Sequence, residues 1–275
     1  MCEGERRLSS MEILLIIGGL IGLVMGLVGA GGGVLAVPAL VAGMGWSMQE
    51  AAPVALIAVA GGAALGAIEG WRKGLVRYRA AFFMVLCGLP LTPFGLSVAH
   101  RLPQRWVQLL FAAVILVVVV RLIRKALSSS TPVDERKLAR INPETGRFRW
   151  TWLSSGLFAG VGALAGFLSG LLGVGGGFVI VPALRRFTNI SMHSVVATSL
   201  MVIALVTAGS VSVALLQGAR LPMPATAIFV GATALGVGIG RKLSARLPEK
   251  TIQCGFAVVL LLAASHLVLR ALRSG

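Results

Sequence analysis

The sequence predicts an all-helical, multi-pass membrane protein made of two homologous repeats. Three observations predict this fold class: the composition, the order of the apolar segments, and the duplication of a glycine-rich stretch. Of the 275 residues, 57% are hydrophobic and only 12% are charged, and the mean hydropathy is +0.92. Soluble domains carry about 25% charged residues. This chain therefore has too few polar side chains to cover the surface of a soluble protein.

The net charge of +16 does not indicate nucleic-acid binding. Lys and Arg lie mainly in short segments between apolar runs, where such residues orient a membrane protein and contact anionic headgroups. A basic face with interleaved aromatic side chains, as a nucleic-acid interface requires, is not visible. We expect a multi-pass protein of a bacterial-type plasma (inner) membrane, with the lipid bilayer as its partner. A homo-oligomer is compatible with the sequence, and no nucleic-acid partner is expected.

Ten apolar segments predict helices, because a membrane span must satisfy its own backbone hydrogen bonds. They lie at 12–28, 33–45, 48–69, 78–98, 105–126, 153–172, 177–188, 193–217, 222–243 and 250–272. Each half thus holds a Gly-rich pair, broken or re-entrant, and three spanning helices, giving about 8–10 helices in all. Residues 1–126 form the first transmembrane repeat, 127–149 a polar cytoplasmic linker, and 150–275 the second repeat.

The repeat is clearest in two Gly-rich stretches, residues 26–40 and 170–184. They align without a gap at an offset of 144 residues, and 10 of the 15 positions are identical. In both copies three adjacent glycines interrupt apolar sequence, Gly31-Gly32-Gly33 in the first and Gly175-Gly176-Gly177 in the second. A duplication of this kind is typical of transporters built from internal repeats.

Two topologies fit the short segments 33–45 and 177–188, because a span needs about 20 residues. If each glycine cluster is the tip of a hairpin that returns to its own side, each half crosses three further times and the halves are inverted. If instead the first apolar segment of each half crosses the membrane, each half has four crossings and the halves are parallel. The inverted arrangement puts 18 Lys and Arg residues on the cytoplasmic side and the parallel one puts 17 there. The positive-inside rule therefore barely distinguishes the two topologies. We favour inverted repeats, which point both glycine tips at the midplane.

The triple glycines predict an anion site. A helix that starts inside the membrane exposes unpaired N–H groups and the positive end of its dipole, and glycine lets a ligand approach the backbone. Two such starts that converge would bind an anion without a buried charged side chain. By contrast, Gly22-x-x-x-Gly26 and Gly166-x-x-x-Gly170 are more typical of close helix packing.

Few polar side chains accompany the glycines. Thr198 and Ser199 are candidate donors to a bound oxyanion, although hydroxyls in membrane helices often bond back to the i−4 carbonyl. His193 and its repeat partner Gln49 are candidates for coupling or gating, although a histidine at an interface is the commoner case. Glu69 adjoins Arg72 and Lys73 and is expected to pair with them.

The sequence shows no Ser/His/Asp set, no paired carboxylates and no metal-ligand spacing. We therefore expect no enzyme, no metal and no cofactor.

At these residues the chain resembles the TauE/SafE family of membrane permeases, the sulfite exporter family. The resemblance rests on the duplicated G-x-x-G-x-GGG-x-x-x-x-P motif, on the run from Ala197 to Leu200, and on Leu-Pro pairs at Leu102-Pro103 and Leu247-Pro248. It implies a carrier of sulfite or organosulfur anions such as sulfonates or sulfoacetate. The first half departs from the pattern, since Val54-Ala55 stands where a Thr-Ser pair would match the second half, so the site is expected to be asymmetric.

The expected function is secondary transport of a small anion by alternating access, with one half rocking against the other around a midplane site. An anion channel that uses the same glycines as a constriction is the main alternative. A membrane scaffold without transport ranks below it.

Overall fold

The computed structural model describes residues 2–29, 32–127, 151–218, 221–244, 246 and 248–273. Gly31 and almost all of the predicted linker lie outside these residues. Within them the chain is helical, and the elements follow the predicted segments closely. In order they are α1 (Cys2–Val28), η1 (Gly32–Leu35), α2 (Ala36–Met44), α3 (Met48–Arg72), α4 (Tyr78–Gly88), α5 (Leu91–Arg101), α6 (Gln104–Leu127), α7 (Trp152–Leu172), α8 (Gly177–Phe187), α9 (Met192–Leu216), α10 (Met223–Ser244) and α11 (Glu249–Arg273).

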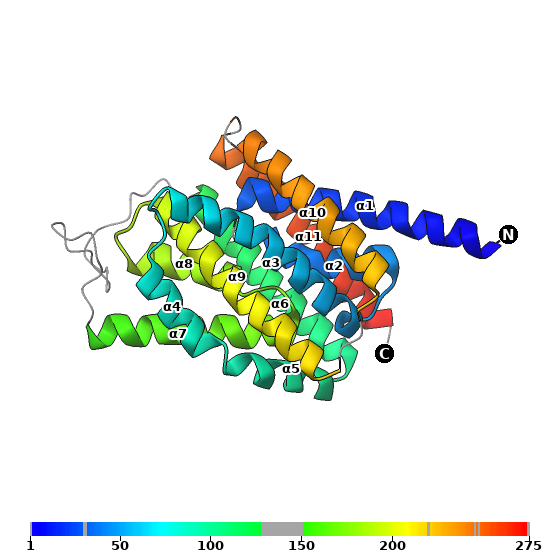
Figure 1. The fold of residues 1–275 in the computed structure, drawn as a ribbon, viewed down its shortest axis with the longest axis horizontal. Coiled ribbons are helices and arrows are strands. Elements are labelled where there is room, and N and C mark those ends of the chain that lie inside the picture. Colours follow the sequence, from blue (N-terminus) through cyan, green and yellow to red (C-terminus); the bar gives the residue numbers. More distant parts are fainter. Residues whose placement is uncertain are drawn as a thin grey trace.

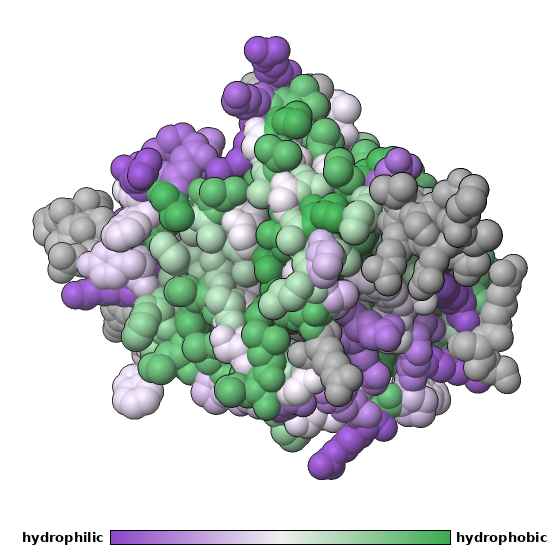
Figure 2. Space-filling model, turned by 45° about the vertical axis from the view of Figure 1, so that its right-hand side comes forward, coloured by the Kyte–Doolittle hydropathy of each residue, from purple (hydrophilic) through white to green (hydrophobic). Residues whose placement is uncertain are grey.

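Seven helices of the described residues are long and apolar enough to cross a membrane: α1, α3, α6, α7, α9, α10 and α11. The bent pair α4 and α5 can make an eighth span. Figure 2 shows hydrophobic side chains across the middle of one face, with many hydrophilic residues toward its margins. Large apolar side chains such as Leu20 and Leu235 are more than half exposed. A surface of this kind belongs in lipid, which establishes an integral, multi-pass membrane protein.

The predicted helix 78–98 is two helices that meet at an angle of 43°. The break falls between Gly88 and Leu91. Pro90 has no N–H to donate to the preceding turn, and its ring crowds the carbonyl there. The sequence predicted one helix over 78–98. The structure has two helices there, although together they can still make one bent span.

In the first half, α2 folds back along α1. A Cβ added at Gly43, near the end of α2, would overlap the Ile17 side chain of α1. At the other end, a Cβ added at Gly32 would lie 2.5 Å from the Cα of Met25, near the end of α1. The helix α2 therefore runs antiparallel to α1, and the two helices form a hairpin with Gly29 and Gly32 near its tip.

Glycines bring α1 into backbone contact with α10, which comes from the other half of the chain. A Cβ added at Gly22 would overlap the carbonyl oxygen of Thr233, and one added at Gly26 would overlap that of Val237. Residue numbers rise together along both helices, so they run parallel. The close approach confirms the packing role predicted for this small-xxx-small pair.

The helix α7 packs on α4 and α5 in the same manner. A Cβ added at Gly166 would overlap the carbonyl oxygen of Gly88, and one added at Gly170 would overlap that of Thr92. Each Gly-rich helix is thus held by helices of the opposite half, and the two halves of the sequence are intertwined.

The helices α3 and α9 cross the middle of the bundle in antiparallel orientation (Figure 1). A Cβ added at Gly70 would lie 2.6 Å from that of Ala197, so the end of α3 lies beside the start of α9. We call this the α3–α4 end of the bundle. At the opposite end, the α2–α3 end, Arg270 of α11 donates to the carbonyl oxygen of Val41 at 2.8 Å.

Candidate functional site

The helix α8 starts at a run of glycines inside the protein. Gly173, Gly175 and Gly176 have φ angles of 72°, 73° and 66°, in the left-handed region that side chains disfavour. Gly176 is the N-cap of α8, and no side chain caps the helix. The first N–H groups of α8 therefore have no partner within the helix or from a cap, and the positive end of its dipole points into the protein. In the first half, the corresponding start is η1 at Gly32.

The two glycine breaks meet at Val59 of α3. A Cβ added at Gly33 would lie 3.0 Å from one Val59 methyl group, and one added at Gly175 would lie 3.2 Å from the other. The same Cβ at Gly33 would lie 3.6 Å from the carbonyl oxygen of Val174, in the second break. Val59 is the twelfth of the 25 residues of α3, so this meeting point lies halfway along a spanning helix. The structure thus brings Gly33 and Gly175 to the same side chain, and the other described site glycines, Gly32, Gly176 and Gly177, adjoin them in the chain.

The contacts around the breaks correspond between the halves. Gly29 lies against Val196 of α9, with 3.2 Å from an added Cβ to a Val196 methyl group. Gly173, which is 144 residues further on, lies against Ala52 of α3, which is 144 residues before Val196. Each break therefore packs against the central helix of the opposite half.

Ser199 is a buried hydroxyl without a hydrogen-bond partner. Its side chain is 0% exposed, and Oγ makes no hydrogen bond. It stands on α9 three residues after Val196, which faces Gly29, and four residues before Ile203, which lies 3.1 Å from a Cβ added at Gly175. Residues three and four apart share a helix face, so Ser199 lies on the face of α9 that meets both glycine breaks. A buried unpaired hydroxyl costs free energy that a bound acceptor would restore.

Thr198 is also buried, but its hydroxyl already has a partner. Its Oγ1 accepts a hydrogen bond of 3.0 Å from the backbone N–H of Arg77, just before α4. This bond ties α9 to the loop between α3 and α4. Because the oxygen only accepts in this bond, the hydroxyl hydrogen stays available as a donor.

His193 and Gln49 are separated from each other and from the glycines. Both are exposed residues near the starts of α9 and α3, and these starts lie at opposite ends of the bundle. Gln49 donates to the carbonyl oxygen of Ala99 at 3.4 Å. The predicted role of these two side chains in coupling or gating stays a prediction.

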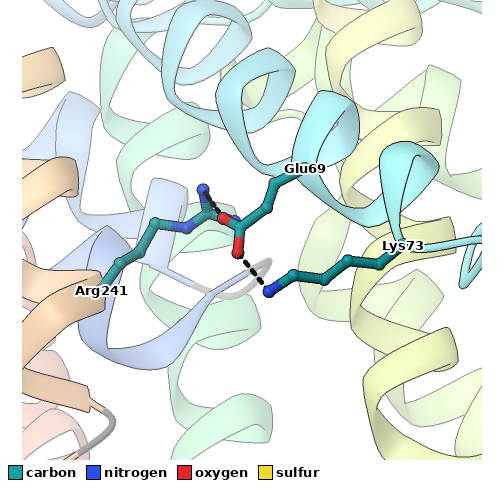
Figure 3. A network of polar contacts seen from close by, with 3 residues as sticks. All are labelled: Glu69, Lys73 and Arg241. Atoms are coloured by element: carbon teal, nitrogen blue, oxygen red, sulfur yellow. Dashed lines mark hydrogen bonds and ion pairs between the residues drawn. The ribbon is translucent and has the colours of Figure 1, made fainter.

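Glu69 joins α3 to α10, a contact that sequence analysis missed. Its carboxylate lies 2.7 Å from Lys73 Nζ, as predicted, and 2.7 Å from Arg241 Nη1 (Figure 3). The expected partner Arg72 is replaced by Arg241, which no local pattern signals because it comes from the other half of the chain. The ion pair holds the α3–α4 end together across the two halves.

No group of three or more His, Cys, Asp or Glu side chains capable of holding a metal occurs in the part of the chain that the structure describes. The site offers backbone N–H groups and hydroxyls, which are ligands for an anion rather than for a metal.

The sequence profile of the family described as sulfite exporter TauE/SafE matches residues 14–267. The chain belongs to this family. It is 27% identical over 197 residues to a probable membrane transporter protein of Xylella fastidiosa strain 9a5c, covering 71% of this chain and 70% of the relative. It is 24% identical over 268 residues to the probable membrane transporter protein YunE of Bacillus subtilis, covering 94% and 97%. No solved structure matches significantly. This TauE/SafE protein is a membrane transporter.

Proposed function

We propose that this TauE/SafE protein is a secondary carrier of small sulfur oxyanions, sulfite or an organosulfonate, which binds them where the two glycine breaks meet. The observation that carries the proposal is the convergence of both breaks on Val59, with the unpaired Ser199 hydroxyl on the adjacent face of α9. Helix starts and hydroxyls donate to all oxygens of a tetrahedral or pyramidal oxyanion without a permanent positive charge. Binding without a fixed charge lets the anion leave again.

In this proposal Ser199 and Thr198 serve only one side of the site. The equivalent residues of the first half, Ala55 and Val54, are apolar and buried. The anion is held by N–H groups from both breaks and by hydroxyls from α9 alone. Gly31, the counterpart of Gly175 in the sequence, lies outside the described residues.

The transport cycle we infer is alternating access with inverted repeats. Two observations support inversion: the hairpin of α1 and α2 returns to its own side, and the equivalent helices α3 and α9 run antiparallel. The glycines at the meeting point, Gly33 and Gly175, are buried, and we therefore interpret this conformation as closed around the site.

The helix packing favours a different pair of moving bodies from the two sequence halves expected above. Because α1 is in backbone contact with α10, and α7 with α4 and α5, the two sequence halves are not separate bodies. We propose that α1 with α10 moves against α7 with α4 and α5, while α3 and α9 lie between them. The Glu69–Arg241 pair links α10 to α3 at the α3–α4 end in the present conformation.

Flux into proteoliposomes tests the substrate class. We expect saturable uptake of radiolabelled sulfite or methanesulfonate, accelerated by the same unlabelled anion on the opposite side. Chloride should not compete. Unitary currents in place of counterflow would identify an anion channel. Absence of flux of any sulfur anion through correctly inserted protein would refute the substrate class.

Cysteine accessibility tests the inverted topology, which places the α3–α4 end in the cytoplasm. In a cysteine-free background we expect Arg72→Cys and Arg246→Cys to be labelled only from the cytoplasmic side. Gln217→Cys, at the end of α9, should be labelled only from outside. All three side chains are exposed. Parallel repeats would instead put Arg72→Cys and Gln217→Cys on one side and Arg246→Cys on the other.

A further inference from the structure

A second polar cavity lies at the α2–α3 end, away from the glycine breaks. Its volume is about 470 Å³, and it is lined by the loop after α2, the start of α6 and the end of α11. This volume falls in the range of small-ligand sites. None of the proposed transport-site residues lines it.

The charge of this cavity is positive. Arg105 and Arg270 both line it, and none of its lining residues is acidic. The start of α6, a helix of 24 residues, also faces the cavity through Gln104 and Arg105. The N–H groups at this helix start and the positive end of its dipole add to the attraction for an anion. Arg270 is held in place by its bond to the Val41 carbonyl oxygen, which leaves its other nitrogens to face a ligand.

Gln108 adds an unpaired hydrogen-bond acceptor beside the cavity. This residue lines the cavity one turn into α6 and is only 3% exposed, yet its Oε1 atom is buried without a partner. A carboxamide oxygen is an acceptor only. A simple anion would leave it unpaired, whereas an anion with a nearby hydroxyl or ammonium group would satisfy it. The site therefore pairs two arginines for an oxyanion with one acceptor for a donor group.

We propose that this cavity binds an oxyanion that carries its own hydrogen-bond donor, with the chemistry of a phosphate ester that bears a hydroxyl or amine. Two sources supply this chemistry: the headgroup of a phospholipid, and a free organic phosphate. The position at a bundle end, beside the half-buried Trp46 and the exposed Trp106, is one where headgroups and the aqueous phase both reach the protein. The proposal is independent of the transported substrate, because it uses none of the glycine-site residues.

Calorimetric titration of the detergent-purified protein tests the proposal with two soluble probes. Glycerol phosphate has an anionic group and hydroxyl donors, whereas dimethyl phosphate has an anionic group and no donor. We expect glycerol phosphate to bind at least tenfold more tightly than dimethyl phosphate. Gln108→Leu should abolish this preference. Arg105→Gln should lower the affinity for both probes about tenfold. Arg124 is an exposed residue at the other end of α6, and Arg124→Gln should change the affinity for neither probe.

A lipid arm distinguishes the two sources. Native mass spectrometry of protein from bilayers of phosphatidylglycerol and phosphatidylcholine should show retained phosphatidylglycerol, lost in Arg105→Gln and kept in Arg124→Gln, if the headgroup is the ligand. If the free phosphate ester is the ligand, no lipid is retained and only the titration shows the Arg105 and Gln108 effects. The proposal is overturned if neither probe nor lipid binds, or if binding is equal in the Arg105 and Arg124 variants. Equal affinity for the two probes in the unmodified protein also overturns it.

Discussion

Replacing Gly22 with valine is expected to prevent the correct packing of α1 on α10. A Cβ at this position would overlap the Thr233 carbonyl oxygen and lie 2.8 Å from its carbonyl carbon and Cα, so the obstacle is backbone and has no rotamer to yield. Overpacking typically costs about 1–3 kcal/mol, occasionally more, and a backbone obstacle puts this contact at the upper end of that range. We expect a large loss of folded protein, measured by thermal denaturation and size-exclusion profile in detergent.

The matched control is Gly19→Val on the same helix. Nothing lies within 4 Å of a Cβ added at Gly19, so this substitution changes helix propensity in the same way without a clash. Its stability should remain within about 1 kcal/mol of the unmodified protein. Gly166→Val should reproduce the Gly22→Val effect in the second half, where the obstacle is the Gly88 carbonyl oxygen. Equal stability of the Gly19 and Gly22 variants would contradict the parallel packing of α1 and α10.

Replacing Ser199 with alanine is expected to stabilise the protein and weaken transport at once. In the ligand-free state the buried hydroxyl has no partner, and its removal should stabilise the fold by about 1 kcal/mol. In the anion-bound state a hydrogen bond to a charged group contributes about 1.5–3 kcal/mol, so its loss should raise the apparent KM for the transported anion tenfold or more. The two measurements are thermal denaturation in detergent and the concentration dependence of flux in proteoliposomes.

Thr198→Val, at the adjacent residue, is the control with the opposite pattern. It removes the acceptor of the Arg77 N–H bond and should lower stability by about 1 kcal/mol. Its effect on KM should be smaller than that of Ser199→Ala, because the Arg77 bond holds the Thr198 hydroxyl toward the α3–α4 end, although its hydrogen can still donate. An unchanged KM in Ser199→Ala would place the anion elsewhere in the protein. A lower stability of that variant would show that the hydroxyl has a structural role.

Hydropathy was sufficient to locate the helices. Membrane helices form wherever an apolar segment must satisfy its own backbone hydrogen bonds, and this is a local requirement. The bounds of α3, α9 and α10 accordingly fall within about three residues of the predicted segments. The segment 78–98 was predicted as one helix, and the break was missed because Pro90 interrupts the hydrogen bonds without interrupting the hydropathy.

The candidate site was predicted only in part. Three adjacent glycines signal a broken helix in any surroundings, because the left-handed angles of Gly175 and Gly176 are available to few other residues. No local sequence pattern indicates that the hydroxyl of Thr198 is hydrogen-bonded and that of Ser199 is not. The two hydroxyls are neighbours in the sequence, but a helix turns about 100° between them, so one contacts the α4 start and the other faces the glycine breaks.

By itself, the sequence determined that this protein is a multi-pass membrane protein, roughly where most of its helices lie, and that each half has a glycine break within apolar sequence. Only the tertiary structure decided that α1 packs on α10, that α3 and α9 are antiparallel, and that Glu69 pairs with Arg241. The physical reason is that helix formation depends on hydrogen bonds between residues four apart, whereas packing inside a membrane depends on shape complementarity between helices distant in the sequence. A glycine marks where a helix can be approached, and the fold determines which helix approaches it.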